Sequence, residues 1–330
     1  MNRIKRWAAN LQLFTSDATL IDRTGAAALI PEENAAEIIQ GAVEASSVLS
    51  LARRLANMGS GTYKMPVLSS LPIAYFVNGD NGAKKTTDQQ WENATITAEE
   101  IAVIVPIPQA VLDDAAYDIW AEVRPRVQEA FGKVIDAAIL FGTNKPASWP
   151  AAIVSGAATA NNVVTLDTDL YQAIMGEDGV IGLVEADGYF VTGHVADISM
   201  RAKLRGLVDT NKQPIFKADM QTGSQYTLDG EPMYFPRNGS FDKTAALDIC
   251  GDWSQLVYSI RQDITFQLFT DGIVQNTDGS IAYNLLQQDM VALRAVMRLG
   301  FALPNPVNGI QPTKASRYPF AVLEPASSNP

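Results

Sequence analysis

The chain has 330 residues with one cysteine, one histidine and a formal net charge of −11. One Cys and one His cannot form an internal disulfide or a zinc site of clustered ligands. The acidic balance argues against a protein that reads nucleic-acid sequence with clustered Lys and Arg. Charged residues make up only 18% and hydrophobic residues 47%, which indicates a surface that largely faces other protein. A large monomer with a high core fraction is the alternative on composition alone.

Residues 1–30 are predicted to form an extended arm, with small residues at Gly25–Ala28 and little periodicity. The basic cluster Arg3, Lys5 and Arg6 marks this arm rather than a DNA site. A helix is predicted from Pro31, a residue favoured at the first helical position, to about Ala45. No apolar run approaches the ~20 residues that span a bilayer, so no membrane partner is expected.

The segment Gly59–Ala98 has the pattern of a two-stranded ribbon. Strands are predicted at Thr62–Leu68 and Ile73–Val77, followed by the turn Asn78–Gly82 and a returning strand near Thr95. A two-stranded ribbon is marginally stable by itself in water. Its apolar side chains therefore need a partner surface, and these are Tyr75, Phe76, Val77 and Trp91. The alternative is an ordinary hairpin packed on its own domain.

A β-branched run at Ile101–Ile107 leads through a turn with Asp113 and Asp114 into a long amphipathic helix that ends at Gly142. The helix would be about 43 Å long at about 1.5 Å per residue, and Pro125 inside it should bend it. Trp120 also lies on it. Its apolar positions step by four and three residues, at Ile119, Val123, Val127, Phe131, Val134, Ala138 and Phe141.

The remainder of the chain is compact and mixed. Helices are predicted from Asp169 to about Val184 and from about Ala196 to Leu204, and strands at Gly188–Thr192, Tyr226–Phe235 (bent at Asp229-Gly230), Ala245–Cys250 and Asp289–Phe301. Residues 304–330 contain six prolines. That number is too high for a helix or a central strand, so an extended tail is predicted.

Few residues carry the pattern of a catalytic site. His194 is the sole histidine and has no nucleophile beside it in the sequence, so a structural histidine is favoured over a Ser-His-Asp relay. No phosphate-binding or dinucleotide-binding glycine motif is present. Asp113 and Asp114 are predicted to cap the long helix rather than to form a carboxylate dyad. No catalytic, cofactor-binding or metal site is expected.

The order of these parts resembles the major capsid proteins of tailed phages with the Hong Kong 97 fold. The resemblance covers roughly Ile30–Pro306 and rests on the Leu29-Ile30-Pro31 segment, the Val-Leu-Asp-Asp-Ala turn before the long helix, and the strand with Leu228, Gly230 and Met233, in which Pro232 is displaced. It implies an α+β fold with these parts: an N-terminal arm (1–30), a helix and connector on the P-domain side (31–58), an E-loop hairpin (59–98), a P-domain strand and spine helix (99–149), an axial A-domain (150–280), a C-terminal P-domain strand beneath the spine helix (281–303) and a Pro-rich tail (304–330).

The resemblance implies a structural protein without enzymatic activity. Hexamers and pentamers of the chain would close into an icosahedral head shell around double-stranded phage DNA, without sequence-specific DNA binding. In such a shell the E-loop contacts a neighbouring subunit, here through Tyr75, Phe76, Val77, Lys84, Lys85 and Trp91, and the spine helix includes Trp120, Val123, Pro125, Val127, Phe131 and Val134.

Several partners are expected from the same resemblance. They are a portal, decoration proteins and a separate scaffolding protein, the last because the start at Met1 leaves no room for a fused scaffold. The location is the virion, after assembly in the host cytoplasm. Some relatives cross-link an E-loop lysine to an asparagine with the help of a glutamate. Lys84 and Lys85 lie in the matching loop, but Asp289–Arg298 contains neither Asn nor Glu, so no cross-link is expected. The alternatives are an encapsulin-type shell protein and a monomeric enzyme or binding domain.

Overall fold

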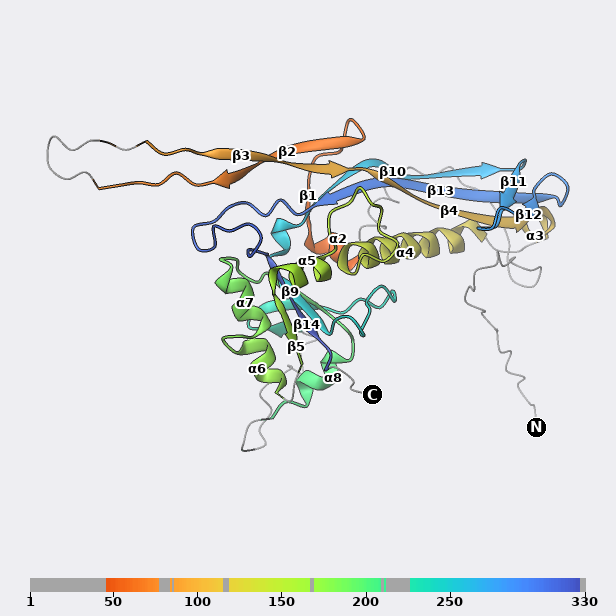
Figure 1. The fold of residues 1–330 in the computed structure, drawn as a ribbon. Coiled ribbons are helices and arrows are strands. Elements are labelled where there is room, and N and C mark those ends of the chain that lie inside the picture. Colours follow the sequence, from red (N-terminus) through yellow and green to blue (C-terminus); the bar gives the residue numbers. More distant parts are fainter. Residues whose placement is uncertain are drawn as a thin grey trace. The chain divides into compact units, whose positions relative to one another are not determined.

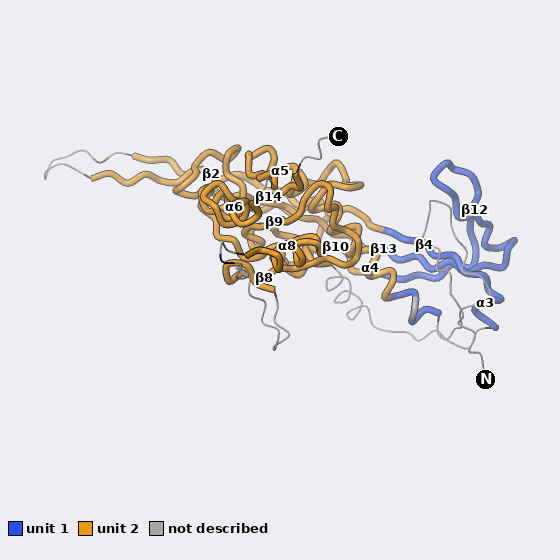
Figure 2. The backbone as a smooth tube through the Cα atoms, turned by 90° about the horizontal axis from the view of Figure 1, so that it is seen from below, with its two compact units in different colours: residues 1–33, 102–124, 265–296 blue, residues 34–101, 125–264, 297–330 orange. Residues whose placement is uncertain are grey.

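The computed structural model describes residues 46–76, 84, 86–114, 119–166, 169–208, 211 and 226–326. The predicted arm, the helix from Pro31, Val77 and Lys85 lie outside these residues. The chain divides into two compact units (Figure 2): unit 1 comprises residues 1–33, 102–124 and 265–296, and unit 2 comprises 34–101, 125–264 and 297–330. Among the described residues, no helix is both long enough and apolar enough to cross a membrane.

Unit 2 contains a mixed six-stranded sheet in the order β5-β14-β9-β6-β8-β7. Figure 1 labels three of these strands, β5, β14 and β9. The central strand β14 runs parallel to β5 and antiparallel to β9, and β6 runs antiparallel to β9 and parallel to β8. The strands are β5 (Val163–Thr165), β6 (Gly193–Ala196), β7 (Thr227–Leu228), β8 (Glu231–Tyr234), β9 (Asp248–Gly251) and β14 (Phe320–Glu324).

Short helices pack on this sheet: α5 (Ile153–Ala160), α6 (Leu170–Met175), α7 (Val180–Ala186) and α8 (Met200–Arg205). Apolar side chains of α6, α7 and α8 form one buried cluster with Met233, Cys250 and Leu323 of the strands. The cap of α6 is as predicted, because the Asp169 side chain accepts hydrogen bonds from the backbone N–H groups of Tyr171 and Gln172. The single helix predicted from Asp169 to Val184 is wrong, since Gly176 and Gly179 adopt extended backbone and divide it in two.

Two further predictions in this region need correction. The strand predicted at Gly188–Thr192 is β6 at Gly193–Ala196, and α8 begins at Met200 rather than near Ala196. The apolar run misled the prediction because Phe190 is 80% exposed, whereas the polar His194 lies in the buried strand. The predicted bend at Asp229-Gly230 is confirmed: both residues have positive φ and join β7 to β8.

The Pro-rich tail is also different from its prediction. Residues Phe320–Glu324 form β14, the strand between β5 and β9, and Phe320 to Leu323 are all buried. Pro319 and Pro325 flank this strand without interrupting it, so every position within it keeps the backbone N–H that a central strand requires. The proline count of the whole segment therefore hid a short proline-free stretch.

A four-stranded sheet has the order β1-β10-β13-β4. Its residues in unit 1 pack with the helix α3 (Gln109–Asp113) and the first turn of α4 in a cluster that includes Ile107, Val111, Trp120 and Leu293. The contact of β13 with the start of α4 agrees with the strand expected beneath the long helix. The strands are β1 (Arg53–Arg54), β4 (Glu99–Pro108), β10 (Val257–Phe269) and β13 (Met290–Ala302), and a separate hairpin pairs β11 (Ile273–Gln275) with β12 (Ile281–Asn284).

The long helix is α4 (Ile119–Leu140), with Pro125 inside it. Its buried positions are Ile119, Trp120, Val127, Phe131, Gly132, Ile135, Asp136, Ala138, Ile139 and Leu140, and Val123 is half-buried. Val134 lies on this helix as predicted, and its side chain is 45% exposed. In the second half of the helix the buried stripe passes through Ile135 and Ile139, and Val134 lies at its edge.

Candidate functional site

The strands β2 (Thr62–Ser70) and β3 (Gln90–Thr97) form an antiparallel ribbon (Figure 1), with Thr62 opposite Thr97 at its base. The predicted strand at Ile73–Val77 is wrong as far as it is described, since Ile73–Phe76 has no strand structure. Ile96 is buried at the base, and the half-buried Met65 packs against the same cluster. The base of the ribbon is therefore packed in an apolar cluster of unit 2.

Apolar side chains farther along this ribbon are exposed. Phe76 is fully exposed, Trp91 is 63% exposed and Ile73 is 60% exposed. Tyr75 and Lys84 are exposed as well. A hydrogen bond of 2.9 Å from the Ile73 backbone N–H to Thr87 Oγ1 ties the two sides of the ribbon together. An array of exposed aromatic side chains on an ordered ribbon is typical of a protein-binding surface.

The base of the ribbon is held by close contacts within unit 2. Trp149 Nε1 donates a hydrogen bond of 3.1 Å to the Thr97 carbonyl oxygen, and the Trp149 ring packs edge-on against Phe301. Gly300 lies so close to Thr97 that a Cβ atom there would be 2.3 Å from the same carbonyl oxygen. Glycine is therefore required at this position of β13 by the approach of the backbone.

A buried carboxylate joins three distant segments of unit 2. Asp136 on α4 has no solvent exposure. It accepts hydrogen bonds from Ser46 Oγ, from the backbone N–H groups of Ser47 (3.1 Å) and Val48 (3.3 Å), and from Asn238 Nδ2 (3.3 Å). Asp136 thus fixes the start of α2 (Ser47–Leu51) against the long helix. Sequence reasoning missed it, although it is the one charged residue in the run Val134–Leu140.

Burial raises the pKa of Asp136 from 3.8 to about 6, and the four hydrogen bonds only partly oppose that effect. The folded protein then binds the proton more tightly than the unfolded chain does. This contribution to stability, about 3 kcal/mol, is fully present below pH 3.8 and is lost as the pH rises through about 6.

We expect Asp136→Asn, which does not titrate, to isolate this effect. The free energy of unfolding of the native chain minus that of the variant should increase by about 2–3 kcal/mol as the pH falls from 7.5 to 4. Urea unfolding of both proteins across this range measures the difference, in which contributions from other carboxylates cancel. A difference that does not change with pH would contradict the raised pKa.

A second buried polar cluster lies in the six-stranded sheet. His194 Nδ1 is 2.9 Å from Asp248 Oδ2, and Cys250 is directly opposite His194 in the pairing of β6 with β9. The residue types match a Cys-His-Asp relay, and no local sequence pattern indicates this pairing. All three side chains are fully buried, and burial, together with the Asp248 carboxylate, raises the pKa of the Cys250 thiol. The arrangement therefore lacks both substrate access and a thiolate.

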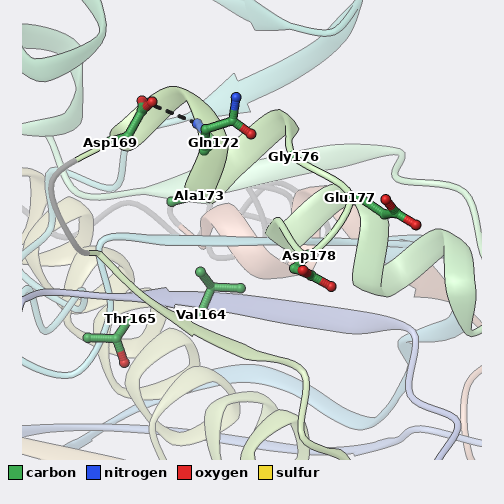
Figure 3. A pocket seen from close by; sticks show the side chains of 8 residues that line it. All are labelled: Val164, Thr165, Asp169, Gln172, Ala173, Gly176, Glu177 and Asp178. Carbon is green, nitrogen blue, oxygen red and sulfur yellow. Dashed lines mark hydrogen bonds between the residues drawn. The ribbon is translucent and has the colours of Figure 1, made fainter.

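The other acidic residues in the described part of the chain do not converge on a site. Asp113 accepts a hydrogen bond from Gln109 Nε2 at the end of α3, and its predicted role at the start of α4 involves residues 115–118, which are outside the described part. A cavity of about 440 Å³ beside α6 is lined by Val164, Thr165, Asp169, Gln172, Ala173, Gly176, Glu177 and Asp178 (Figure 3). Figure 3 shows Asp169 apart from Glu177 and Asp178. Among the described residues no group of three His, Cys, Asp or Glu side chains could hold a metal ion.

Comparisons with known proteins give a consistent result. The model of the phage capsid family matches residues 26–314. The major capsid protein of Staphylococcus phage 80alpha is 28% identical over 309 residues, which cover 89% of this chain and 87% of the relative. A solved structure from Microbacterium phage Oxtober96 has 34% identity and a TM-score of 0.74, covering 85% of this chain and 91% of that one. One from Mycobacterium phage Bobi has 27% identity and a TM-score of 0.75, covering 98% and 96%.

The family match spans most of the chain, and the similar structures agree with the α+β architecture described above. The long helix, the paired ribbon and the mixed sheet are thus parts of a capsid subunit of the Hong Kong 97 type, and the protein is a virion component. The chain belongs to the phage capsid family and is a major capsid protein that forms the capsid shell together with copies of itself.

Proposed function

We propose that this capsid protein assembles into hexamers and pentamers that close into an icosahedral shell around double-stranded DNA, and that its β2–β3 ribbon lies on a neighbouring subunit as an E-loop. The observation that carries the proposal is the exposure of Trp91 on β3 and of Phe76 in the segment that follows β2. Burying such side chains is worth roughly 1.5–3 kcal/mol each. The ribbon residues in this contact are Tyr75, Phe76, Val77, Lys84, Lys85 and Trp91.

The other parts have matching roles in this proposal. The six-stranded sheet and its helices form the axial A-domain, which takes in β14 from the C-terminal segment. The helix α4, with Trp120, Val123, Pro125, Val127, Phe131 and Val134, is the spine helix of the P-domain. Residues 1–30 form an arm that reaches a neighbouring subunit. The exposed Val134 adds an apolar contact point on the spine helix.

The protein acts by assembly and not by catalysis in this proposal, which the complete burial of the His194, Asp248 and Cys250 cluster supports. Its net charge of −11 allows the shell to enclose DNA without binding it tightly. Assembly takes place in the host cytoplasm with a separate scaffolding protein. A portal and decoration proteins complete the head.

Electron microscopy of the purified protein tests this function. Expression together with the scaffolding protein should give closed icosahedral shells of uniform diameter, and shells from infected cells should contain DNA. A chain that stays a monomer of about 36 kDa under both conditions would overturn the proposal. Well-formed shells from this chain alone would contradict the need for a separate scaffolding protein. Shells filled with an enzyme would favour an encapsulin-type compartment protein.

A further inference from the structure

The connection between β13 and β14 is anchored by a buried arginine. Arg317 is 2% exposed. Its guanidinium donates hydrogen bonds to Asn305 Oδ1 (3.0 Å), to the Asn305 carbonyl oxygen (3.0 Å), and to the carbonyl oxygens of Gln311 (2.8 Å) and Pro312 (3.2 Å). Asn305 Nδ2 donates in return to the Arg317 carbonyl oxygen at 2.7 Å. These bonds close residues 305–317 into one loop around the guanidinium.

The same loop is fastened to the end of α7. Tyr189 Oη donates a hydrogen bond of 2.8 Å to Asn305 Oδ1, and Asn308 Nδ2 donates one of 2.7 Å to the Asp187 carbonyl oxygen. Asp187 in turn accepts from the Tyr318 backbone N–H at 2.9 Å. The loop is therefore attached to the body of unit 2 through buried or half-buried groups.

This loop also contacts both strands of the ribbon. The Val307 backbone N–H donates a hydrogen bond of 3.0 Å to the Leu68 carbonyl oxygen on β2. Lys314 Nζ forms an ion pair with Glu92 on β3. Leu68 lies opposite Trp91 and Val67 opposite Glu92 in the ribbon, so the two contacts grip the ribbon at one level. That level lies about 20 Å from the base at Thr62, at about 3.4 Å per residue.

We propose that residues 305–317 form a strap that fixes the direction in which the β2–β3 ribbon leaves the subunit, with Arg317 as its buried anchor and the contacts to Leu68 and Glu92 as its grip. A ribbon that is held only at its base can rotate about that base. A second attachment about 20 Å along the ribbon fixes the direction of its axis. The role of this direction in shell assembly rests on the proposed function of the ribbon, but the strap itself does not.

The two ends of the strap differ in strength. The anchor consists of charge-assisted hydrogen bonds from a desolvated guanidinium, which are among the stronger polar contacts in proteins. The grip consists of one backbone hydrogen bond and one ion pair whose side chains are 59% and 53% exposed, and such pairs are weak. The contacts to Leu68 and Glu92 are therefore the first to open. Opening them frees the ribbon to change direction, while the hydrogen bonds of Arg317 keep residues 305–317 closed as a loop.

A charge-swap series tests the grip in the unassembled subunit. Glu92→Lys and Lys314→Glu each place like charges together, and the double variant restores an opposite pair. Amide hydrogen exchange at Val307 reports the grip directly, since this amide donates to Leu68. Each single variant should exchange about twofold to fivefold faster there, and the double variant should return to the native rate. Lys64→Glu, an exposed ribbon position nearer the base, is the charge-matched control and should leave the rate unchanged.

The anchor has its own variant. Asn305 has a positive φ of 47°, so glycine at this position keeps the backbone conformation. Asn305→Gly removes the side-chain oxygen Oδ1, which accepts hydrogen bonds from Arg317 Nε and Tyr189 Oη. Faster exchange at Val307 in this variant, with the native Lys314 and Glu92 present, is expected. An unchanged Val307 rate in the single charge variants, or no return in the double variant, overturns the strap.

Shell assembly of the same proteins separates the two proposals. The single charge variants should give a smaller fraction of well-formed shells by electron microscopy, and the double variant should recover the native fraction. If exchange at Val307 follows the expected pattern while all variants assemble alike, the strap stands and the role of the ribbon in assembly fails.

Discussion

A chain that stops after Pro319 should not yield a folded subunit, whereas a chain that stops after Ala326 should fold and assemble normally. The first truncation removes β14, whose residues Phe320 to Leu323 have no solvent exposure. It also removes the strand partner of β5, which pairs with β14 alone among the described strands. Circular dichroism and the soluble yield of the two truncated chains measure this difference.

A point substitution in β14 measures how much this strand contributes to the free energy of unfolding. Leu323→Ala should lower the free energy of unfolding by about 2–5 kcal/mol, the usual cost of a cavity in a packed core. Ile198→Ala, at a side chain that is 51% exposed in the same unit, should change it by no more than about 0.5 kcal/mol. Equal effects of the two substitutions in urea unfolding would mean that β14 is not a central strand.

Replacing the aromatic residues Phe76 and Trp91 with aspartate should prevent shell assembly at the concentration that suffices for the native protein, and should leave the subunit folded. Both side chains are largely exposed in the single chain, so their loss costs little within it. In the proposed shell each would be buried against a neighbour at roughly 1.5–3 kcal/mol, and every 1.4 kcal/mol is a tenfold change in association. The concentration needed for assembly should rise at least tenfold, and more because each subunit has several neighbours.

Light scattering during assembly measures that concentration, and thermal unfolding of the subunit confirms its fold. The control is Asn93→Asp, which adds the same charge at an exposed position of β3 two residues from Trp91. Assembly of Phe76→Asp and Trp91→Asp at the native concentration would contradict a role of the ribbon between subunits.

The sequence predicts best those elements whose pattern is local and regular. The apolar steps of α4 and the strand β13 are recognisable from periodicity. The turn at Asp229-Gly230 and the cap at Asp169 are recognisable from their residue types. The ribbon is recognised by its turn residues and by its aromatic side chains. Each of these signals lies within a few tens of residues, where the period of a helix or strand decides the structure.

The errors have a common physical cause, since they concern positions that tertiary packing decides. Phe190 belongs to an apolar run and yet is exposed. His194 and Cys250 meet only because β6 and β9 pair in one register. The hydrogen-bond partners of Asp136 come from the start of α2 and from the loop with Asn238, and those of Arg317 come from a loop. No local pattern specifies that these segments meet.

The place of β14 has a consequence for synthesis. Both β5 and β9 precede β14 in the chain, so they are synthesised before the strand that lies between them. A nascent chain, or one that ends before residue 320, has no β14 to join β5 to β9. We expect such a chain to be excluded from the shell, so that the order of the strands makes assembly depend on the synthesis of β14.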